Sequence, residues 1–93
     1  MEIRTFANVW DALSDSPEEA ANLTMRSDVM SALAGRVRGW GTTQAEAARR
    51  LGISQPRLSD LLRGKIAKFS LDTLVTLAVR AGLEVRIDIS DAA

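Results

Sequence analysis

The sequence predicts a mainly α-helical domain that ends in one short β-strand. Apolar residues recur at helical spacing in about five segments, which begin at capping residues and end near glycines. Residues 83–90 instead alternate apolar and polar side chains, which is the period of a half-buried strand. A chain of 93 residues is long enough for one core and too short for two. We therefore expect one domain over residues 1–93.

The composition excludes most enzyme chemistry. The chain has no Cys, His or Tyr, so it cannot build a Ser–His–Asp or Cys–His site, a disulfide or a zinc finger. It also has no glycine pattern of the kind that holds a nucleotide. We expect a protein that is not an enzyme and that uses no cofactor or metal.

Two observations bear on the compartment. The first 15 residues carry four charged side chains, and no run of 18 apolar residues occurs. These features predict neither a signal peptide nor a membrane span. The expected location is the cytoplasm.

The N-terminal part of the chain predicts a short helix followed by a long one. Residues 1–15 form an arm whose short helix places Phe6, Val9, Trp10 and Leu13 on one face. Ser16 caps the long helix, with Pro17 in its first turn and Glu19 placed to complete a capping box. Its apolar stripe continues to Trp40. The sequence leaves open the alternative that this helix breaks into two near Gly35.

Three shorter helices follow, so that residues 17–82 make a helical core. Capping residues mark their starts and glycines their ends: Thr43, Ser54 and Ser70, then Gly52, Gly64 and Gly82. Residues 44–63 have the spacing of a helix-turn-helix, with a small residue, Ala48, at the crossing and Gly52 in the turn. Its inward positions are apolar: Ala47, Leu51, Ile53, Leu58 and Leu61.

The formal net charge of zero conceals a basic middle segment. Residues 36–70 hold eight basic and two acidic side chains, whereas residues 1–35 hold two basic and six acidic ones. Solvated helix faces would account for scattered charges, but these basic residues are clustered. Clustering of this kind is typical of a protein that binds phosphate groups.

The outward positions of the helix-turn-helix carry side chains suited to DNA. The candidate base readers lie near the start of the second helix: Gln55, Pro56, Arg57 and Ser59. The candidate contacts to the DNA backbone are Thr43, Gln44, Ser54, Arg63, Lys65 and Lys68. Asp60 is discordant: it accepts from cytosine, pairs with Arg57 or Arg63, or simply faces solvent.

The run from Thr43 through Gly52-Ile53-Ser54-Gln55-Pro56 to Arg63-Gly64-Lys65 and Phe69-Ser70 resembles the Cro/CI-type (XRE) DNA-binding domains. Together with Phe6–Leu13 and Pro17–Ala20, it is similar to their HigA-like antitoxin branch. The resemblance implies a lambda-repressor-like fold and a homodimeric repressor of operator DNA. Many members bind a RelE-like or HigB-like toxin that cleaves mRNA, so the resemblance also implies such a partner. A stand-alone or phage-type regulator without a toxin is the alternative.

An acidic, aromatic-bearing N-terminal region would suit a basic toxin. The candidate toxin-binding residues are Phe6, Trp10, Asp11, Leu13, Glu18 and Glu19. The alternative is that the two aromatic side chains belong to the core.

The C-terminal strand needs a partner, because one strand cannot satisfy its own backbone groups. One option is residues 2–6 of the same chain. The other, which we favour, is the same strand of a second copy, with Val85, Ile87 and Ile89 at the dimer interface.

Overall fold

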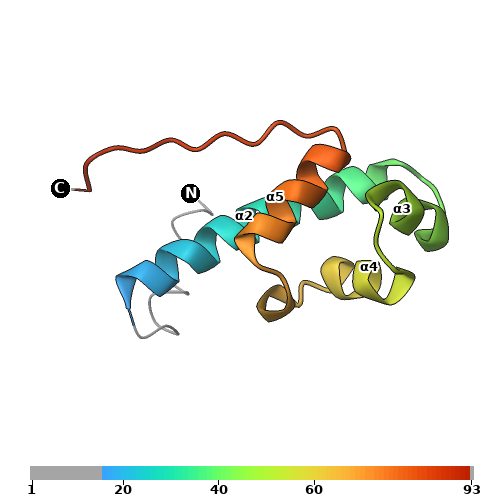
Figure 1. The fold of residues 1–93 in the computed structure, drawn as a ribbon, viewed down its shortest axis with the longest axis horizontal. Coiled ribbons are helices and arrows are strands. Elements are labelled where there is room, and N and C mark those ends of the chain that lie inside the picture. The colour runs from blue at the N-terminus through green and yellow to red at the C-terminus, as the bar shows by residue number, and fades with distance from the viewer. Residues whose placement is uncertain (1–15, 93) are drawn as a thin grey trace.

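The protein is described by a computed structural model that places residues 16–92. In chain order the elements are α2 (Pro17–Gly39), α3 (Gln44–Leu51), α4 (Gln55–Leu62), the 3-10 turn η1 (Ile66–Lys68) and α5 (Leu71–Arg80). Figure 1 shows α2 as a long rod with the shorter helices gathered toward its C-terminal end. The mainly helical prediction is confirmed. The short helix expected in the arm lies outside the described residues.

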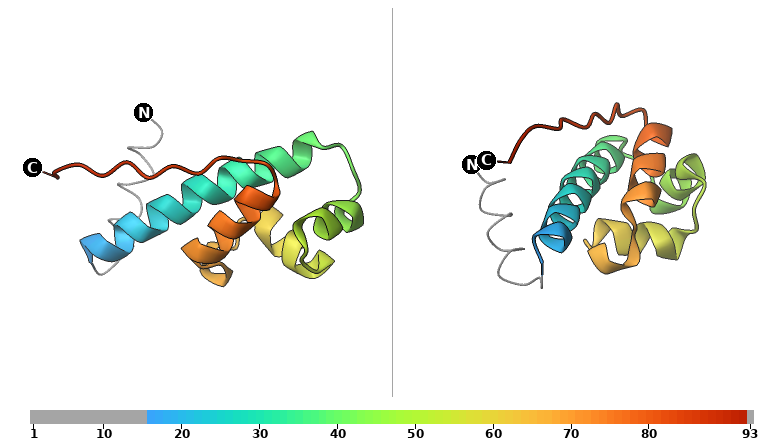
Figure 2. Two further views of the ribbon diagram at one scale, coloured as in Figure 1. Left: turned by 45° about the horizontal axis from the view of Figure 1, so that its top comes forward. Right: turned by 60° about the vertical axis from the view of Figure 1, so that its left-hand side comes forward.

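Helix α2 is one uninterrupted helix, so the open alternative of a break near Gly35 is wrong. The Ser16 hydroxyl accepts a hydrogen bond from the Glu19 amide at 3.1 Å, as expected of the N-cap. Leu33 and Val37 lie one turn apart and are both buried, so packing holds the helix through the glycine. Figure 2 shows that α3, α4, η1 and α5 lie along one side of α2.

The core lies between α2 and the shorter elements. Leu33 from α2, Leu51 from α3, Leu58 from α4 and Leu74 from α5 are fully buried and belong to one cluster with Phe69. The inward positions predicted for the helix-turn-helix are confirmed, because all of them are buried except Ile53, which is partly buried and packs against the cluster. No polar or charged side chain among the described residues is buried.

The three short helices end in the same way. Gly52 adopts a left-handed conformation with φ of 72°, and the amide of the next residue, Ile53, donates to the Ala48 carbonyl at 3.0 Å. Gly64 and Gly82 repeat this arrangement after α4 and α5. The turn glycine predicted for the helix-turn-helix is therefore confirmed.

An arginine from another helix closes each of these three ends. Arg80 donates to the Leu51 carbonyl of α3 at 2.9 Å, and Arg38 donates to the Leu62 carbonyl of α4 at 2.9 Å. Arg36 donates to the carbonyl of Ala81, the residue that caps α5, at 3.0 Å. Since the last carbonyls of a helix have no partner inside it, these arginines satisfy acceptors and oppose the negative end of the helix dipole.

The expected strand at residues 83–90 does not form: residues 16–92 contain no strand. The segment runs as an extended chain back along α2, and no second extended segment within the described residues makes a ladder with it (Figures 1 and 2). Ile87 and Ile89 are 65% and 87% exposed, while Val85 is partly buried. The alternative partner at residues 2–6 lies outside the described part of the chain.

The turn between α3 and α4 depends on Gly52. We expect Gly52→Ala to lower the free energy of unfolding by about 1–2 kcal/mol. The left-handed conformation is about that much less favourable for a residue with a Cβ than for glycine. The new Cβ would also lie 3.2 Å from Nη1 of Arg80. Gly35→Ala is the matched control, because nothing lies within 4 Å of the new methyl group in mid-helix. It should stabilise by about 0.5–1 kcal/mol in urea denaturation. Equal effects of the two changes would contradict this account.

Candidate nucleic-acid interface

The start of each helix in the helix-turn-helix is set by a side-chain cap. The Thr43 hydroxyl accepts from the Glu46 amide at 3.1 Å, and the Ser54 hydroxyl accepts from the Arg57 amide at 3.3 Å. These bonds fix where α3 and α4 begin. Thr43 and Ser54, both predicted contacts to the DNA backbone, are exposed, and their hydroxyl oxygens are engaged in capping.

The two glutamines at the starts of α3 and α4 are presented to solvent. Gln44 and Gln55 are exposed, and neither side chain makes a hydrogen bond to the part of the chain that the structure describes. Pro56 is exposed beside Gln55, whereas Ser59 is partly buried. The amide groups of both glutamines are thus available to a ligand outside the protein.

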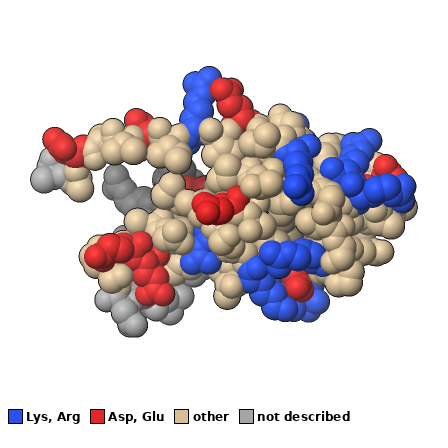
Figure 3. All heavy atoms as spheres, in the orientation of Figure 1, with Lys and Arg blue, Asp and Glu red and all other residues tan. Residues whose placement is uncertain are grey.

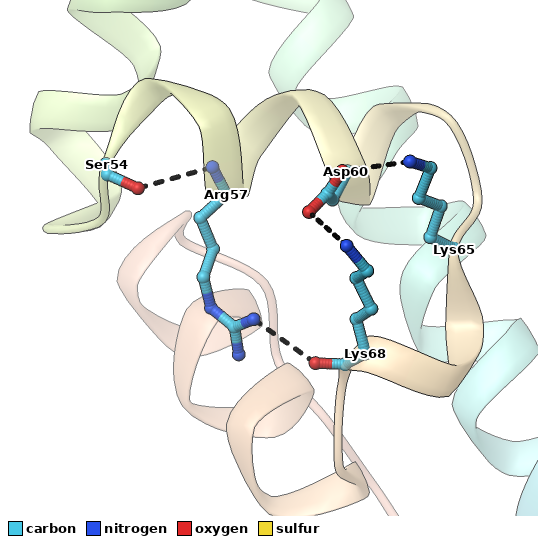
Figure 4. Close-up of polar contacts among 5 residues, drawn as sticks. All are labelled: Ser54, Arg57, Asp60, Lys65 and Lys68. Atoms are coloured by element: carbon cyan, nitrogen blue, oxygen red, sulfur yellow. Dashed lines mark hydrogen bonds and ion pairs between the residues drawn. The ribbon is translucent and has the colours of Figure 1, made fainter.

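Arg57 has partners inside the protein. Its guanidinium lies over the Phe69 ring, 4.3 Å from the centroid, and donates to the Lys68 carbonyl at 3.2 Å. Both partners lie in or just after η1, so Arg57 ties α4 to the segment that follows it (Figure 4). A base contact by Arg57 stays a prediction, and it would have to use N–H groups that do not donate to the Lys68 carbonyl.

Asp60 pairs with neither Arg57 nor Arg63, the two partners that the sequence suggested. Its carboxylate is shared by two lysines: Nζ of Lys65 lies 3.4 Å from Oδ1, and Nζ of Lys68 lies 3.4 Å from Oδ2 (Figure 4). The sequence signal that could have found this cluster is the pair of lysines five and eight residues later.

The lysines also set the protonation of Asp60. Burial acts to raise the pKa of the carboxyl, but the hydrogen bonds and charges of Lys68 and Lys65 outweigh it, so the pKa lies below the ordinary value of 3.8. The stabilisation that comes with a lowered carboxyl pKa is present above the unfolded-state pKa and is lost as the pH falls through the folded-state value. Asp60 is therefore ionised at neutral pH.

Two arginines of α3 also have partners inside the protein, one in α3 itself and one at the end of α2. Arg49 pairs with Glu46 at 2.9 Å, and the guanidinium of Arg50 lies 4.8 Å from the centroid of the Trp40 ring. Arg63, a predicted backbone contact, is exposed, and its side chain makes no hydrogen bond, ion pair or ring contact to the described residues. Of the predicted basic contacts, Arg63 is thus the one whose charge has no internal partner in residues 16–92.

The charges are separated in space as well as in sequence. Figure 3 shows basic side chains gathered around α3, α4 and η1, and acidic side chains over the start of α2 at the other end. Glu18 and Glu19, from the predicted toxin-binding set, are exposed in this first turn of α2. The other members of that set, Phe6, Trp10, Asp11 and Leu13, lie outside the described residues.

Other site types find no support in residues 16–92. No group of three His, Cys, Asp or Glu side chains in this range is placed to hold a metal ion. None of the helices described has the length and apolar character needed to cross a bilayer.

Comparison with known families agrees with this architecture. The fold and the exposed helix starts define a helix-turn-helix protein, and a family described as a helix-turn-helix domain matches residues 12–90. The chain belongs to this helix-turn-helix family. Its membership supports the interpretation that the protein binds DNA. No curated protein shows a significant match to the sequence.

Proposed function

We propose that the protein is a sequence-specific, DNA-binding transcriptional repressor that acts as a homodimer and has no enzymatic activity. The observation that carries the proposal is the pair of exposed glutamines, Gln44 and Gln55, at the starts of α3 and α4 beside the basic surface. A recognition helix reads base edges from its N-terminal end, and the N-terminus of the preceding helix suits a phosphate.

The two glutamines would have different tasks. Gln55 heads the recognition helix α4, and a glutamine amide can pair with adenine through two hydrogen bonds. Gln44 lies at the start of α3, where the free backbone amides and the helix dipole favour a phosphate oxygen. Pro56 and Ser59 would add contacts to bases next to the one that Gln55 reads, and Arg63 would anchor the backbone.

Two substitutions separate base reading from backbone binding. We expect Gln55→Ala to weaken binding to the operator by about 1–3 kcal/mol and to relax specificity at one position. Arg63→Ala should weaken binding to every duplex alike and reduce the salt dependence, as a log–log slope, by about one. Gel-shift titrations at two salt concentrations, with the gene's own upstream region and a shuffled duplex, measure both. Equal losses on both duplexes for Gln55→Ala would refute base reading.

We further propose that residues 83–90 become a strand when two copies associate. The segment has exposed Ile87 and Ile89 and backbone groups without a ladder in the described chain. Two antiparallel copies would pair the backbone groups on the facing edges of the two segments and join two helix-turn-helix units about a twofold axis. A dimer can then contact half-sites about one helical turn, or roughly 10 bp, apart.

Charge distinguishes two registers of this pairing. With the twofold axis at Ile87, Arg86 lies opposite the partner's Asp88, and Val85 lies opposite the partner's Ile89. With the axis at Arg86, two arginines meet, and Glu84 faces the partner's Asp88. Like charges directly opposite each other destabilise a ladder, so the register centred on Ile87 is preferred over the one centred on Arg86.

A charge exchange tests the register. Arg86→Asp and Asp88→Arg, each alone, should raise the dimer dissociation constant by about tenfold, because each replaces two attractive pairs with repulsive ones. The double variant should return it close to the wild-type value. Size-exclusion chromatography with light scattering, at a series of protein concentrations, measures the dissociation constant. A wild-type protein that is monomeric at micromolar concentration would rule out the pairing itself.

We also propose that the protein is the antitoxin of a type II toxin–antitoxin pair, which regulates its own operon and neutralises a RelE-like or HigB-like toxin. The resemblance to HigA-like antitoxins supports this, as does the acidic start of α2 at the end away from the basic surface. A basic ribonuclease would be attracted to that acidic end. A stand-alone or phage-type regulator is the alternative, and it would use the same DNA surface.

Deletion of residues 1–15 tests the antitoxin role. The full chain should form a complex with the product of an adjacent gene that encodes a small basic protein, and the deletion should lose that complex. The same deletion should still shift operator DNA. Retained binding to the neighbouring product with lost operator binding would reverse this division of labour, and the absence of such a gene would favour the stand-alone regulator.

A further inference from the structure

Three charged side chains at the end of α4 form a cluster in which one carboxylate holds two ammonium groups. Asp60 is a residue of α4, Lys65 directly precedes η1, and Lys68 is the last residue of η1. Each lysine contacts a different carboxylate oxygen at 3.4 Å (Figure 4). The Asp60 side chain is 22% exposed, whereas the Lys65 and Lys68 side chains are 40% and 56% exposed.

The cluster is held in place from a second side. Arg57 donates to the Lys68 carbonyl and stacks on Phe69, the residue after Lys68. The backbone of Lys68 is thus fixed by Arg57 while its ammonium group is drawn to Asp60. The ammonium groups of both lysines therefore lie beside the Asp60 carboxylate of α4.

Asp60 sits within the stretch proposed to contact DNA. Pro56 lies four residues before it in α4, and Arg63, the residue that caps the C-terminal end of α4, lies three residues after it, so all three occupy neighbouring positions on the surface of this helix and its end. A carboxylate at this place competes with phosphate for the two lysines. A lysine that contacts DNA must therefore break its ion pair with Asp60 or divide its hydrogen bonds between the carboxylate and a phosphate.

We propose that Asp60 restrains the electrostatic part of DNA binding by holding Lys65 and Lys68, so that the protein binds arbitrary duplexes weakly and depends on base contacts. This rests on the proposed DNA-binding function. The restraint weakens the sequence-independent part of DNA binding, so that base contacts make up a larger share of the binding free energy.

Asp60→Asn tests the restraint, because it removes the charge and keeps the shape. We expect affinity for a shuffled duplex to rise severalfold and the salt dependence to steepen by between about one and two in log–log slope, as one or both lysines reach phosphates. Asp28→Asn is the matched control. It makes the same charge change at an exposed position of α2, outside the segments proposed to contact DNA or a second copy, and it should change neither quantity.

Substitution of the two lysines provides a second test. In a Lys65→Gln, Lys68→Gln background, Asp60→Asn should give no gain in affinity for the shuffled duplex and no steeper slope. If the gain persists in that background, Asp60 acts by direct repulsion and the restraint through the lysines is wrong. Chemical denaturation of each variant shows that it is folded before its DNA binding is compared.

The other outcomes are distinct. Loss of affinity for the upstream region alone in Asp60→Asn would make Asp60 a base reader and overturn the proposal. Unchanged binding to both duplexes, with lowered stability only, would make the cluster purely structural and also overturn it. If the wild-type protein binds neither duplex, the proposed function itself fails, which is recognisable before any variant is tested.

Discussion

The fold depends on closing the C-terminal ends of three short helices. Helices α3, α4 and α5 have eight, eight and ten residues, and helices of that length are marginal in water without tertiary support. Each ends at a glycine in the left-handed conformation, and each has a carbonyl at its end that accepts from an arginine of another helix. These contacts connect α5 to α3, α2 to α4 and α2 to the end of α5, across the hydrophobic core that the same helices share.

This closure divides the basic residues into two groups. Arg36, Arg38 and Arg80 serve the scaffold, and Arg26 joins them by donating to the carbonyls of Ile66 and Phe69 at 3.2 Å. The side chains that remain at the surface of α4 and η1 serve the proposed interface. The segment 36–70 is basic for both reasons, and its charge alone does not distinguish them.

Local patterns predicted the helices because their causes are local. Caps at Thr43 and Ser54, the turn at Gly52 and the apolar inward positions depend on neighbours within a few residues, and all are found as expected. The arginine contacts span 24 to 45 residues in sequence, so no spacing rule indicates them.

The same limit applies to the candidate site. Gln44, Gln55 and Pro56 could be predicted as exposed because the helix period places them outward. The stacking of Arg57 on Phe69 and the sharing of Asp60 between two lysines arise only when η1 folds back beside α4. The strand at 83–90 was predicted from alternation, but alternation describes a segment, and a strand also needs a neighbour.

The length of α2 determines how strongly the charges at its two ends interact. Its 23 residues span about 34 Å at 1.5 Å per residue, with acidic side chains in the first turn and α3 beginning just beyond the last. At physiological ionic strength the Debye length is about 8 Å, so exposed charges at one end are screened from the other by about four such lengths. A molecule with zero net charge therefore presents two independent local potentials of opposite sign, and neither weakens the other.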